Sequence, residues 1–167
     1  MSKETKISAG SYDLNRFLEG GYENDIISMI VGPAGSGKTN FVLLTAVSQA
    51  KKGNKVIFMD SEGGFSLDRI KQVSGEDYEK VIENILVLKP MSFDEQEKEF
   101  QKLLKLLKEK QIGLIIVDSM TMLYRLKLGE VRGYEEEIKK INNSLARQMR
   151  TLAEIARNKN IPVLVTN

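Results

Sequence analysis

The segment Gly32–Thr39 restricts the fold of this chain more than any other feature, because it fits the phosphate-loop pattern G-x-x-x-x-G-K-[ST]. The β-branched run Ile26–Val31 precedes it and a helical pattern follows it, which is the order that this pattern requires. Glycines let successive backbone N–H groups turn inward around phosphate oxygens, and the following helix adds its partial positive charge. These features favour a phosphate-binding loop over an ordinary glycine-rich turn. The predicted loop consists of Gly32, Pro33, Ala34, Gly35, Ser36, Gly37, Lys38 and Thr39.

Two side chains of this loop predict ATP with Mg²⁺ as the ligand. Lys38 is expected to reach the β- and γ-phosphates, and the hydroxyl of Thr39 to coordinate Mg²⁺. The metal needs a partner carboxylate, and Asp118 ends the apolar run Leu114–Val117. Ligands of open α/β sheets bind at this carboxyl end of the strands. Taken alone, Asp118 could equally cap the next turn, but together with the loop it is the predicted second metal ligand.

Five short apolar runs predict the strands of a sheet. Each is continuously apolar rather than alternating, as expected of strands buried on both faces of a parallel sheet. Helical patterns lie between them, and this alternation favours βαβ units. We therefore expect an α/β fold, with a mostly parallel β-sheet and helices on both faces. The predicted strands are Ile26–Val31, Lys55–Asp60, Ile85–Leu88, Ile112–Asp118 and Ile161–Thr166.

Three segments carry helical signals. The first runs from Gly37 to about Lys51 and ends before Gly53, which suits a C-terminal cap. The second, Ser92–Lys110, begins with an S-x-x-E capping box and has a one-sided apolar stripe. The third, Tyr134–Asn160, places apolar residues at three- and four-residue steps, which predicts a long amphipathic helix. Its charge run Glu135–Lys140 is interpreted as a solvated face.

The composition limits the possible chemistry. A length of 167 residues fits one domain, and a net charge of +2 makes no general case for nucleic acid or membrane as a partner. The chain has no cysteine and no histidine, so any general base must be a carboxylate, a lysine or a tyrosine. No apolar run reaches the length of a membrane span, and the N-terminus lacks the core of a signal peptide. We expect a cytoplasmic protein.

Glu62 is the candidate base for hydrolysis of the nucleotide. It follows the strand Lys55–Asp60 in the stretch D-S-E-G-G-F, and it would lie level with Asp118 if the two strands are neighbours. A carboxylate at this position can orient and deprotonate a water in line with the γ-phosphate. The alternative is an exposed loop glutamate. A small-molecule kinase usually needs an arginine-rich lid over the phosphates, and none is evident here.

Together these residues make the chain similar to the RecA/RadA recombinase superfamily, most closely to its archaeal RadB branch. The resemblance spans nearly the whole chain, and its most specific part is D-S-E-G-G-F with an arginine seven residues after the glutamate. It implies a RecA-like P-loop NTPase core over residues 1–167 that acts in DNA repair and homologous recombination. The matching stretches are Ser8–Gly21, Gly32–Asn40, Phe58–Ile70, Leu114–Arg125 and Ile161–Asn167.

The resemblance also implies roles for single residues. Glu62 aligns with the catalytic glutamate of the family, and Arg69 with the arginine that packs against adenine; Arg69 could equally be a surface helix residue. Asn40 extends the matching phosphate loop. The family's strand order places the Asp60 strand beside the Asp118 strand, and the final strand between the Asp118 strand and the phosphate-loop strand. Glu62, Asp118 and Lys38 would then share one crevice.

The family's first DNA-facing loop corresponds to about Tyr124–Tyr134. Arg125, Lys127 and Arg132 are the candidate contacts to DNA phosphates, single-stranded or double-stranded. The alternative is a polar surface loop between a strand and a helix. The resemblance further implies that the protein binds a RadA-type recombinase, as a mediator or regulator, or associates with itself, and it implies no membrane partner.

This sequence departs from the family pattern at its end. The pattern continues past the last strand with a glutamine that senses the γ-phosphate, whereas this sequence stops at Asn167. The family's further strands, on the far side of the phosphate-loop strand, are also absent. We therefore expect a core that is truncated after its fifth strand and that shows weak DNA-linked hydrolysis.

Two other functions stay open at this point. A KaiC-like ATPase or autokinase shares the expected fold, but that family usually carries paired glutamates where this chain has Ser61-Glu62. A nucleotide-dependent interaction module with little hydrolysis would need Lys38 but not Glu62.

Overall fold

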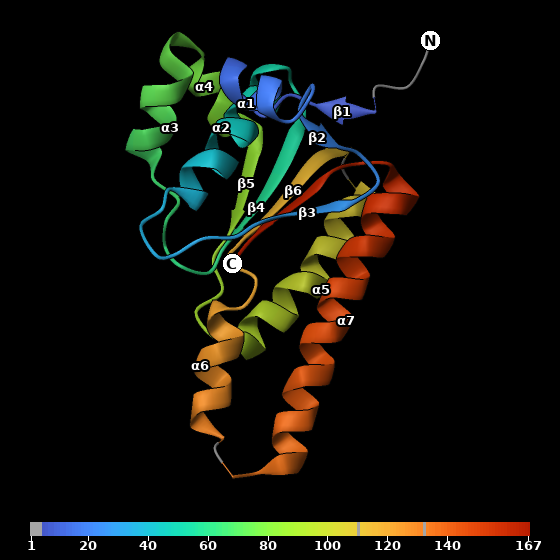
Figure 1. Cartoon of the computed structure of the whole chain (residues 1–167). Coiled ribbons are helices and arrows are strands. Elements are labelled where there is room, and N and C mark those ends of the chain that lie inside the picture. Colours follow the sequence, from blue (N-terminus) through green and yellow to red (C-terminus); the bar gives the residue numbers. More distant parts are fainter. Residues whose placement is uncertain (1–4, 110, 132) are drawn as a thin grey trace.

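The computed structural model describes residues 5–109, 111–131 and 133–167, and its centre is a five-stranded parallel sheet (Figure 1). The strand order is β3-β7-β6-β4-β5. This confirms the expected α/β fold and both neighbour relationships that the resemblance implied. The strands are β3 (Ile27–Ile30), β4 (Lys55–Asp60), β5 (Ile85–Leu88), β6 (Ile112–Asp118) and β7 (Val163–Thr166).

Helices cover both faces of the sheet. Successive residues of a strand point to opposite faces, so Val56 and Phe58 join one apolar cluster while Ile57 and Met59 join the other. The first cluster packs against α2 (Lys38–Lys51), α3 (Leu67–Ser74) and α4 (Tyr78–Glu83), and the second against α5 (Phe93–Glu109) and α7 (Glu135–Lys159). Burial on both faces explains why the central strands read as continuous apolar runs.

The ends of the predicted helices follow their capping residues. Helix α2 begins at Lys38, directly after the phosphate loop, and Gly53 follows its end with a φ of 86°. At the start of α5, Ser92 Oγ accepts from the Glu95 backbone N–H at 3.1 Å. The carboxylate of Glu95 accepts from the N–H of Met91 rather than from that of Ser92. The charged run at the start of α7 is exposed, as predicted.

Several short elements carry no periodic pattern long enough to be predicted. A two-stranded antiparallel sheet joins β1 (Lys6–Ile7) to β2 (Tyr22–Glu23), and α1 (Tyr12–Phe17) lies between them in the chain. A 3₁₀ turn, Gly75–Asp77, links α3 to α4. Two-residue strands and single-turn helices depend on tertiary contacts, so local sequence specifies them weakly.

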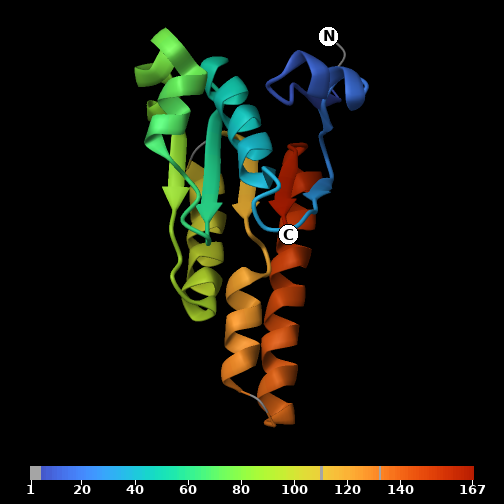
Figure 2. The same ribbon diagram turned by 60° about the vertical axis from the view of Figure 1, so that its left-hand side comes forward.

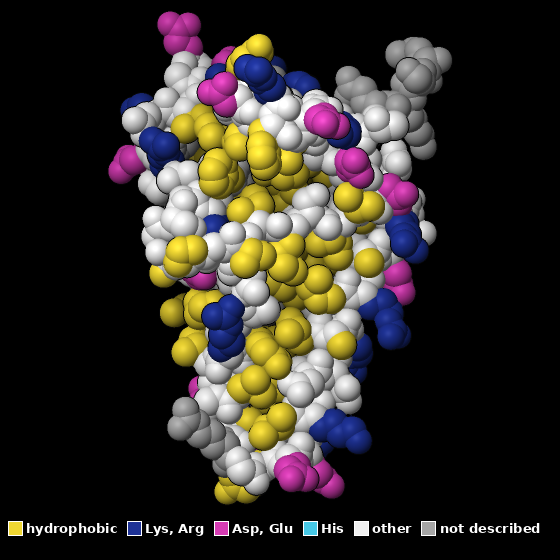
Figure 3. All heavy atoms as spheres, in the orientation of Figure 1, with side chains coloured by type: hydrophobic (Ala, Val, Ile, Leu, Met, Phe, Trp, Pro, Cys, Tyr) yellow, Lys and Arg dark blue, Asp and Glu magenta, His cyan; other side chains and the backbone are white. Residues whose placement is uncertain are grey.

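The prediction that every strand is buried on both faces is wrong for β3. Met29 on this strand is 51% exposed, and its flanking residues Ile26 and Val31 are exposed as well. Among the described strands, β3 pairs with β7 alone and forms an edge of the sheet. Apolar side chains gather on this face of the molecule, over β3 and down toward the hairpin of α6 and α7 (Figure 3). An edge strand is buried less than a central one, although its sequence is equally apolar.

The segment predicted to be a DNA-facing loop is mostly a helix, which corrects that expectation. Helix α6 (Met122–Glu130) and α7 form a hairpin that projects beyond the sheet (Figures 1 and 2). Tyr124, Leu128 and Val131 pack against the cluster of Phe93, Leu123 and Ile141. Their spacing of four and three residues is helical and could have been recognised. Among the described residues, no helix is both long and apolar enough to cross a membrane.

Candidate nucleotide-binding site

A cavity of about 560 Å³ opens at the carboxyl edge of the sheet, where β3, β6 and β7 end. One wall is the phosphate loop with the start of α2, and the other comes from the first turns of α6 together with the chain end after β7. Glu62 contributes from the loop after β4. The lining residues are Gly32, Ala34, Gly35, Gly37, Lys38, Thr39, Asn40, Glu62, Ser119, Met122, Arg125, Leu126 and Asn167.

The phosphate loop has the backbone that its sequence predicts. Gly37 precedes α2 with a φ of 92°, a left-handed conformation that favours glycine. A Cβ at Gly32 would lie 2.7 Å from Ser36 Oγ, so a side chain there would force the serine hydroxyl to move. Lys38 Nζ donates to the carbonyl oxygens of Gly32 at 2.8 Å and Pro33 at 3.0 Å. The ammonium group is therefore held across the loop, beside the first turn of α2.

Thr39 and Asp118 meet below this loop, although 79 residues separate them in the chain. Thr39 Oγ1 donates to Asp118 Oδ2 at 2.7 Å, and the hydroxyl of Thr166 donates to Asp118 Oδ1. Asp118 is 1% exposed, so its carboxylate depends on these hydroxyl groups and on any cation that binds there. The predicted metal pair is thus brought together, with Thr166 as a third oxygen that the sequence did not suggest.

The oxygen donors suit Mg²⁺ bound together with phosphates. Mg²⁺ in nucleotide sites commonly takes one or two protein oxygens and completes its shell with phosphate and water. In the described part of the chain, no group of three or more histidine, cysteine or acidic side chains could hold a metal by itself. The single carboxylate of Asp118 with the Thr39 hydroxyl fits a metal that arrives with the nucleotide.

The loop after β4 is held against this pair by Asp60. Asp60 is 3% exposed; its Oδ1 accepts from Gly64 N–H at 3.0 Å and its Oδ2 from Phe65 N–H at 3.1 Å. The backbone N–H of Ser61 donates to the carbonyl oxygen of Asp118 at 2.6 Å. These bonds leave Glu62 exposed at the cavity wall. Asp60 was not identified from the sequence as the residue that holds this loop, although an aspartate shortly before two glycines is a common turn signal.

Arg69 lies beside the phosphate loop but does not line the cavity. Ser66 Oγ caps α3 by accepting from the Arg69 backbone N–H, which fixes the start of this helix. The side chain of Arg69 donates from Nε to Asn40 Oδ1 at 3.2 Å, and Nη1 donates to Gln72 Oε1. Asn40 does line the cavity, so Arg69 is connected to it through that residue. The adenine contact of Arg69 stays a prediction.

The two candidate DNA contacts that lie within the described residues, Arg125 and Lys127, have different surroundings. Arg125 lines the cavity and donates from Nη2 to Thr121 Oγ1 at 2.8 Å and to Asn167 Oδ1. Lys127 lies in ion pairs with Asp94 at 3.2 Å and Glu130 at 3.8 Å. The hydrogen bond to Asp94 is the main cause that raises the pKa of Lys127. Arg132 lies outside the described residues.

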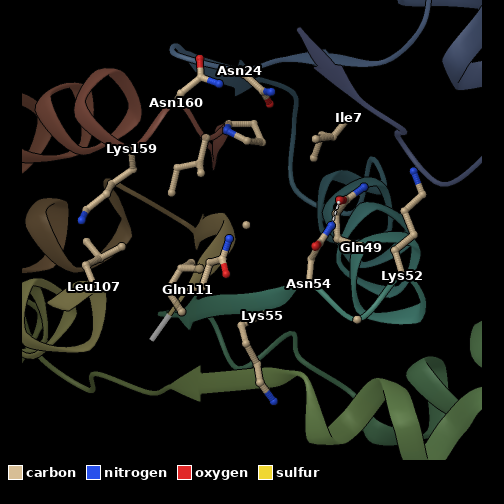
Figure 4. Close-up of a pocket in the computed structure, with 15 residues that line it drawn as sticks. Ile7, Asn24, Gln49, Lys52, Asn54, Lys55, Leu107, Gln111, Lys159 and Asn160 are labelled. Atoms are coloured by element: carbon tan, nitrogen blue, oxygen red, sulfur yellow. Dashed lines mark hydrogen bonds between the residues drawn. The ribbon is translucent and has the colours of Figure 1, made fainter. Parts of the chain in front are cut away.

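A second cavity, of about 910 Å³, lies at the opposite, amino edge of the sheet (Figure 4). The side chains of Lys52, Lys55 and Lys159 line it, but their ammonium groups point away from its centre. Lys55 Nζ donates instead to the carbonyl oxygen of Glu83 at 3.0 Å. Among the described residues that line it, no charged groups converge on its centre, so its larger volume does not make it the candidate site.

Comparison with known proteins agrees with the motifs. The sequence model of the Rad51 family matches residues 2–167. DNA repair and recombination protein RadB is 38% identical in Methanobrevibacter smithii and 40% in Methanosphaera stadtmanae, over 92% of this chain and 64% of each relative. The protein of the same name in Methanococcus maripaludis is 38% identical over 92% of this chain and 69% of the relative. The chain thus spans just under two thirds of the length of the first two. It belongs to the Rad51 family, within the RecA/RadA superfamily, and groups there with the archaeal RadB proteins.

Proposed function

We propose that this chain binds Mg²⁺-ATP in the cavity at the carboxyl edge and hydrolyses it. The observation that carries the proposal is the 2.7 Å contact between Thr39 Oγ1 and Asp118 Oδ2 below the loop that holds Lys38. A hydroxyl from the phosphate loop and a strand-end aspartate are the pair that holds Mg²⁺ in P-loop NTPases. Glu62 lines the same cavity, which supports hydrolysis rather than binding alone.

Each residue would contribute a separate step. Backbone N–H groups of the loop and the ammonium group of Lys38 bind the phosphates, and Lys38 exchanges its two carbonyl partners for phosphate oxygens. Thr39 and Asp118 would hold Mg²⁺, which would neutralise negative charge on the nucleotide's phosphates. Glu62 orients a water and takes its proton. Asp60 keeps the Glu62 loop in register with the phosphates through its two backbone hydrogen bonds.

We further propose that hydrolysis serves DNA repair and homologous recombination. The support is the name of the relatives, which are DNA repair and recombination proteins. The proposed partners are DNA and a RadA-type recombinase, towards which the chain would act as a mediator or regulator. Arg69 would contact the adenine ring, a stacking that suits a planar guanidinium group. Lys127 and Arg132 stay candidates for DNA contact; Lys127 would first have to leave Asp94.

Isothermal titration with Mg²⁺-ATP and a phosphate-release assay test the ATPase proposal. Lys38→Ala should abolish binding, because it removes the cation of the phosphate loop. Lys105→Ala removes an exposed lysine of α5 on the opposite face of the sheet and should change neither measurement. An undiminished titration for Lys38→Ala would refute the assignment of the cavity.

DNA binding is tested separately by titration of labelled single strands at two salt concentrations, with and without ATP. Phosphate contacts predict binding that weakens as salt rises, and Lys127→Ala should reduce the slope of that dependence by about 1. Binding that is absent at both salt concentrations would leave a nucleotide-dependent interaction module as the better function. Phosphate release without any DNA effect would support the ATPase and reject its link to DNA.

A further inference from the structure

Arg125 faces the phosphate loop from the other side of the cavity. It lies in the first turn of α6, whose N-cap is Thr121 at the end of the loop after β6. Its Nη2 donates to Thr121 Oγ1 at 2.8 Å and to Asn167 Oδ1, and the hydroxyl of Thr121 donates to the same Asn167 oxygen. Asn167 itself is fixed by its backbone, since its N–H donates to the Ile30 carbonyl at 3.0 Å. The guanidinium group is therefore held at the cavity wall.

The partners of Arg125 leave its charge uncompensated. Both of these acceptors are neutral oxygens, one from a hydroxyl and one from an amide. Among the described residues, no carboxylate lies within ion-pairing distance of Arg125, whereas Lys127 and Arg147 each have an acidic partner. A guanidinium group has five N–H donors in a planar fork. Arg125 therefore keeps donors and a full charge for an anion in the cavity.

The two cationic side chains that line the cavity come from opposite walls. Of the described lining residues, Lys38 and Arg125 are cationic and Glu62 is anionic. Lys38 comes from the phosphate loop, while Arg125 comes from the far wall, beyond the strand end that carries Asp118. A phosphate chain that begins on the loop and extends across the cavity approaches Arg125 with its last group. Arginine binds phosphate oxygens through two parallel hydrogen bonds more readily than other side chains do.

We propose that Arg125 binds the terminal phosphate of the nucleotide and so distinguishes ATP from ADP. This rests on the proposed function, because it assumes that the cavity takes Mg²⁺-ATP. On binding, the guanidinium group exchanges one or both neutral acceptors, Thr121 and Asn167, for oxygens of the γ-phosphate. Arg125 then acts in the nucleotide site, in place of the DNA contact that the sequence suggested for it.

The test compares the affinities of a slowly hydrolysed ATP analogue and of ADP, both with Mg²⁺, by isothermal titration. Arg125→Ala should weaken binding of the analogue about 10-fold or more, the size of one lost charge-assisted hydrogen-bonding group, and change ADP binding less than about twofold. Arg125→Lys keeps the positive charge but not the planar set of donors. Its affinity for the analogue should lie between those of the alanine variant and the unaltered chain. Arg147→Ala removes an exposed arginine of α7 that pairs with Glu97 of α5, and it should change neither affinity.

Arg125→Gln provides a second variant in case alanine disturbs the fold. Its shorter amide side chain carries no charge, so the variant should lose the preference for the triphosphate while its thermal midpoint stays near that of the unaltered chain. Equal loss of both nucleotides in the alanine and glutamine variants would overturn the inference, since Arg125 would then only shape the wall. Equal affinities of the variants and the unaltered chain would overturn it too. If the unaltered chain binds neither nucleotide, the proposed function itself fails.

Discussion

Gly64 faces Thr39 so closely that a Cβ at position 64 would lie 3.1 Å from Thr39 Cγ2. The same Cβ would lie 3.7 Å from Asp118 Oδ2. Thr39 has little freedom to move aside, because its hydroxyl donates to that carboxylate at 2.7 Å. The loop that carries Glu62 is therefore packed directly against the proposed metal pair. A displacement of this loop would therefore move Glu62, the candidate base, relative to the phosphates of a bound nucleotide.

Gly64→Ala should lower the rate of ATP hydrolysis with little effect on ADP binding. The added methyl group displaces the loop or Thr39 by a few tenths of an ångström, and small misplacements of catalytic groups cost about 10²-fold at 1 Å. We expect a rate loss of about 10-fold and a raised Mg²⁺ requirement, measured by phosphate release over a range of Mg²⁺ concentrations. Gly129→Ala, where an added Cβ meets no atom within 4 Å, is the control. It should stabilise α6 by about 1 kcal/mol and keep the rate.

Glu62→Gln should keep nucleotide binding and reduce turnover roughly 10²-fold or more, the scale of a lost general base. The amide has the same size as the carboxylate but cannot accept the proton of the attacking water. Single-turnover phosphate release isolates this step from product release. Glu154→Gln, an exposed position on α7, controls for the loss of one negative charge. An unchanged rate in Glu62→Gln would remove Glu62 from the mechanism.

Asp60→Asn should loosen the loop after β4. Asp60 is buried and accepts one backbone N–H on each carboxylate oxygen, whereas asparagine offers a single acceptor and turns an NH₂ group toward the other N–H. One buried unsatisfied donor costs about 1–3 kcal/mol. Urea unfolding measures that loss, and hydrogen exchange at Gly64 and Phe65 locates it. Full protection of both amides in the variant would contradict a positioning role for Asp60.

A buried glutamine pair joins α5 to α7. Gln96 Nε2 donates to Gln148 Oε1 at 2.8 Å, and both side chains are buried. Gln148→Leu should destabilise the fold by about 1–3 kcal/mol, because the amide of Gln96 keeps only the carbonyl of Met120 at 3.4 Å. The double variant with Gln96→Leu should recover part of that loss, since neither polar group then remains. Strictly additive free energies of unfolding, from urea titrations of all four chains, would show that the pair is not coupled.

The central sheet and the meeting of Thr39 with Asp118 could be predicted because their signals are mostly local. The phosphate loop is one contiguous pattern, and Asp118 ends a strand whose apolar run is unbroken over four residues. Neighbouring parallel strands end at one edge, so Asp60 and Asp118 come into register, as the pairing of β4 with β6 confirms. To place Asp60 beside Asp118, the only further information needed was the order of the strands in the sheet. The family resemblance supplied that order.

The wall opposite the phosphate loop could not be predicted in the same way. The resemblance placed a loop at Tyr124–Tyr134, and in a loop Arg125 had no fixed direction. Helix α6 instead begins at Met122, a short turn after β6 ends at Asp118, and places Arg125 at the cavity wall. Thr166 and Asn167 join the site only because β7 lies between β3 and β6. These contacts depend on which strand ends lie beside the start of α6 in the folded chain. No short stretch of sequence specifies that arrangement.

The two hydroxyl groups that bind Asp118 have a consequence for the way a cation would enter the site. Thr166 engages one carboxylate oxygen, so the other keeps facing Thr39. A cation that binds both Thr39 and Asp118 would have to replace the 2.7 Å hydrogen bond between them. The hydrogen bond from Thr166 to the other carboxylate oxygen could remain and keep Asp118 in place.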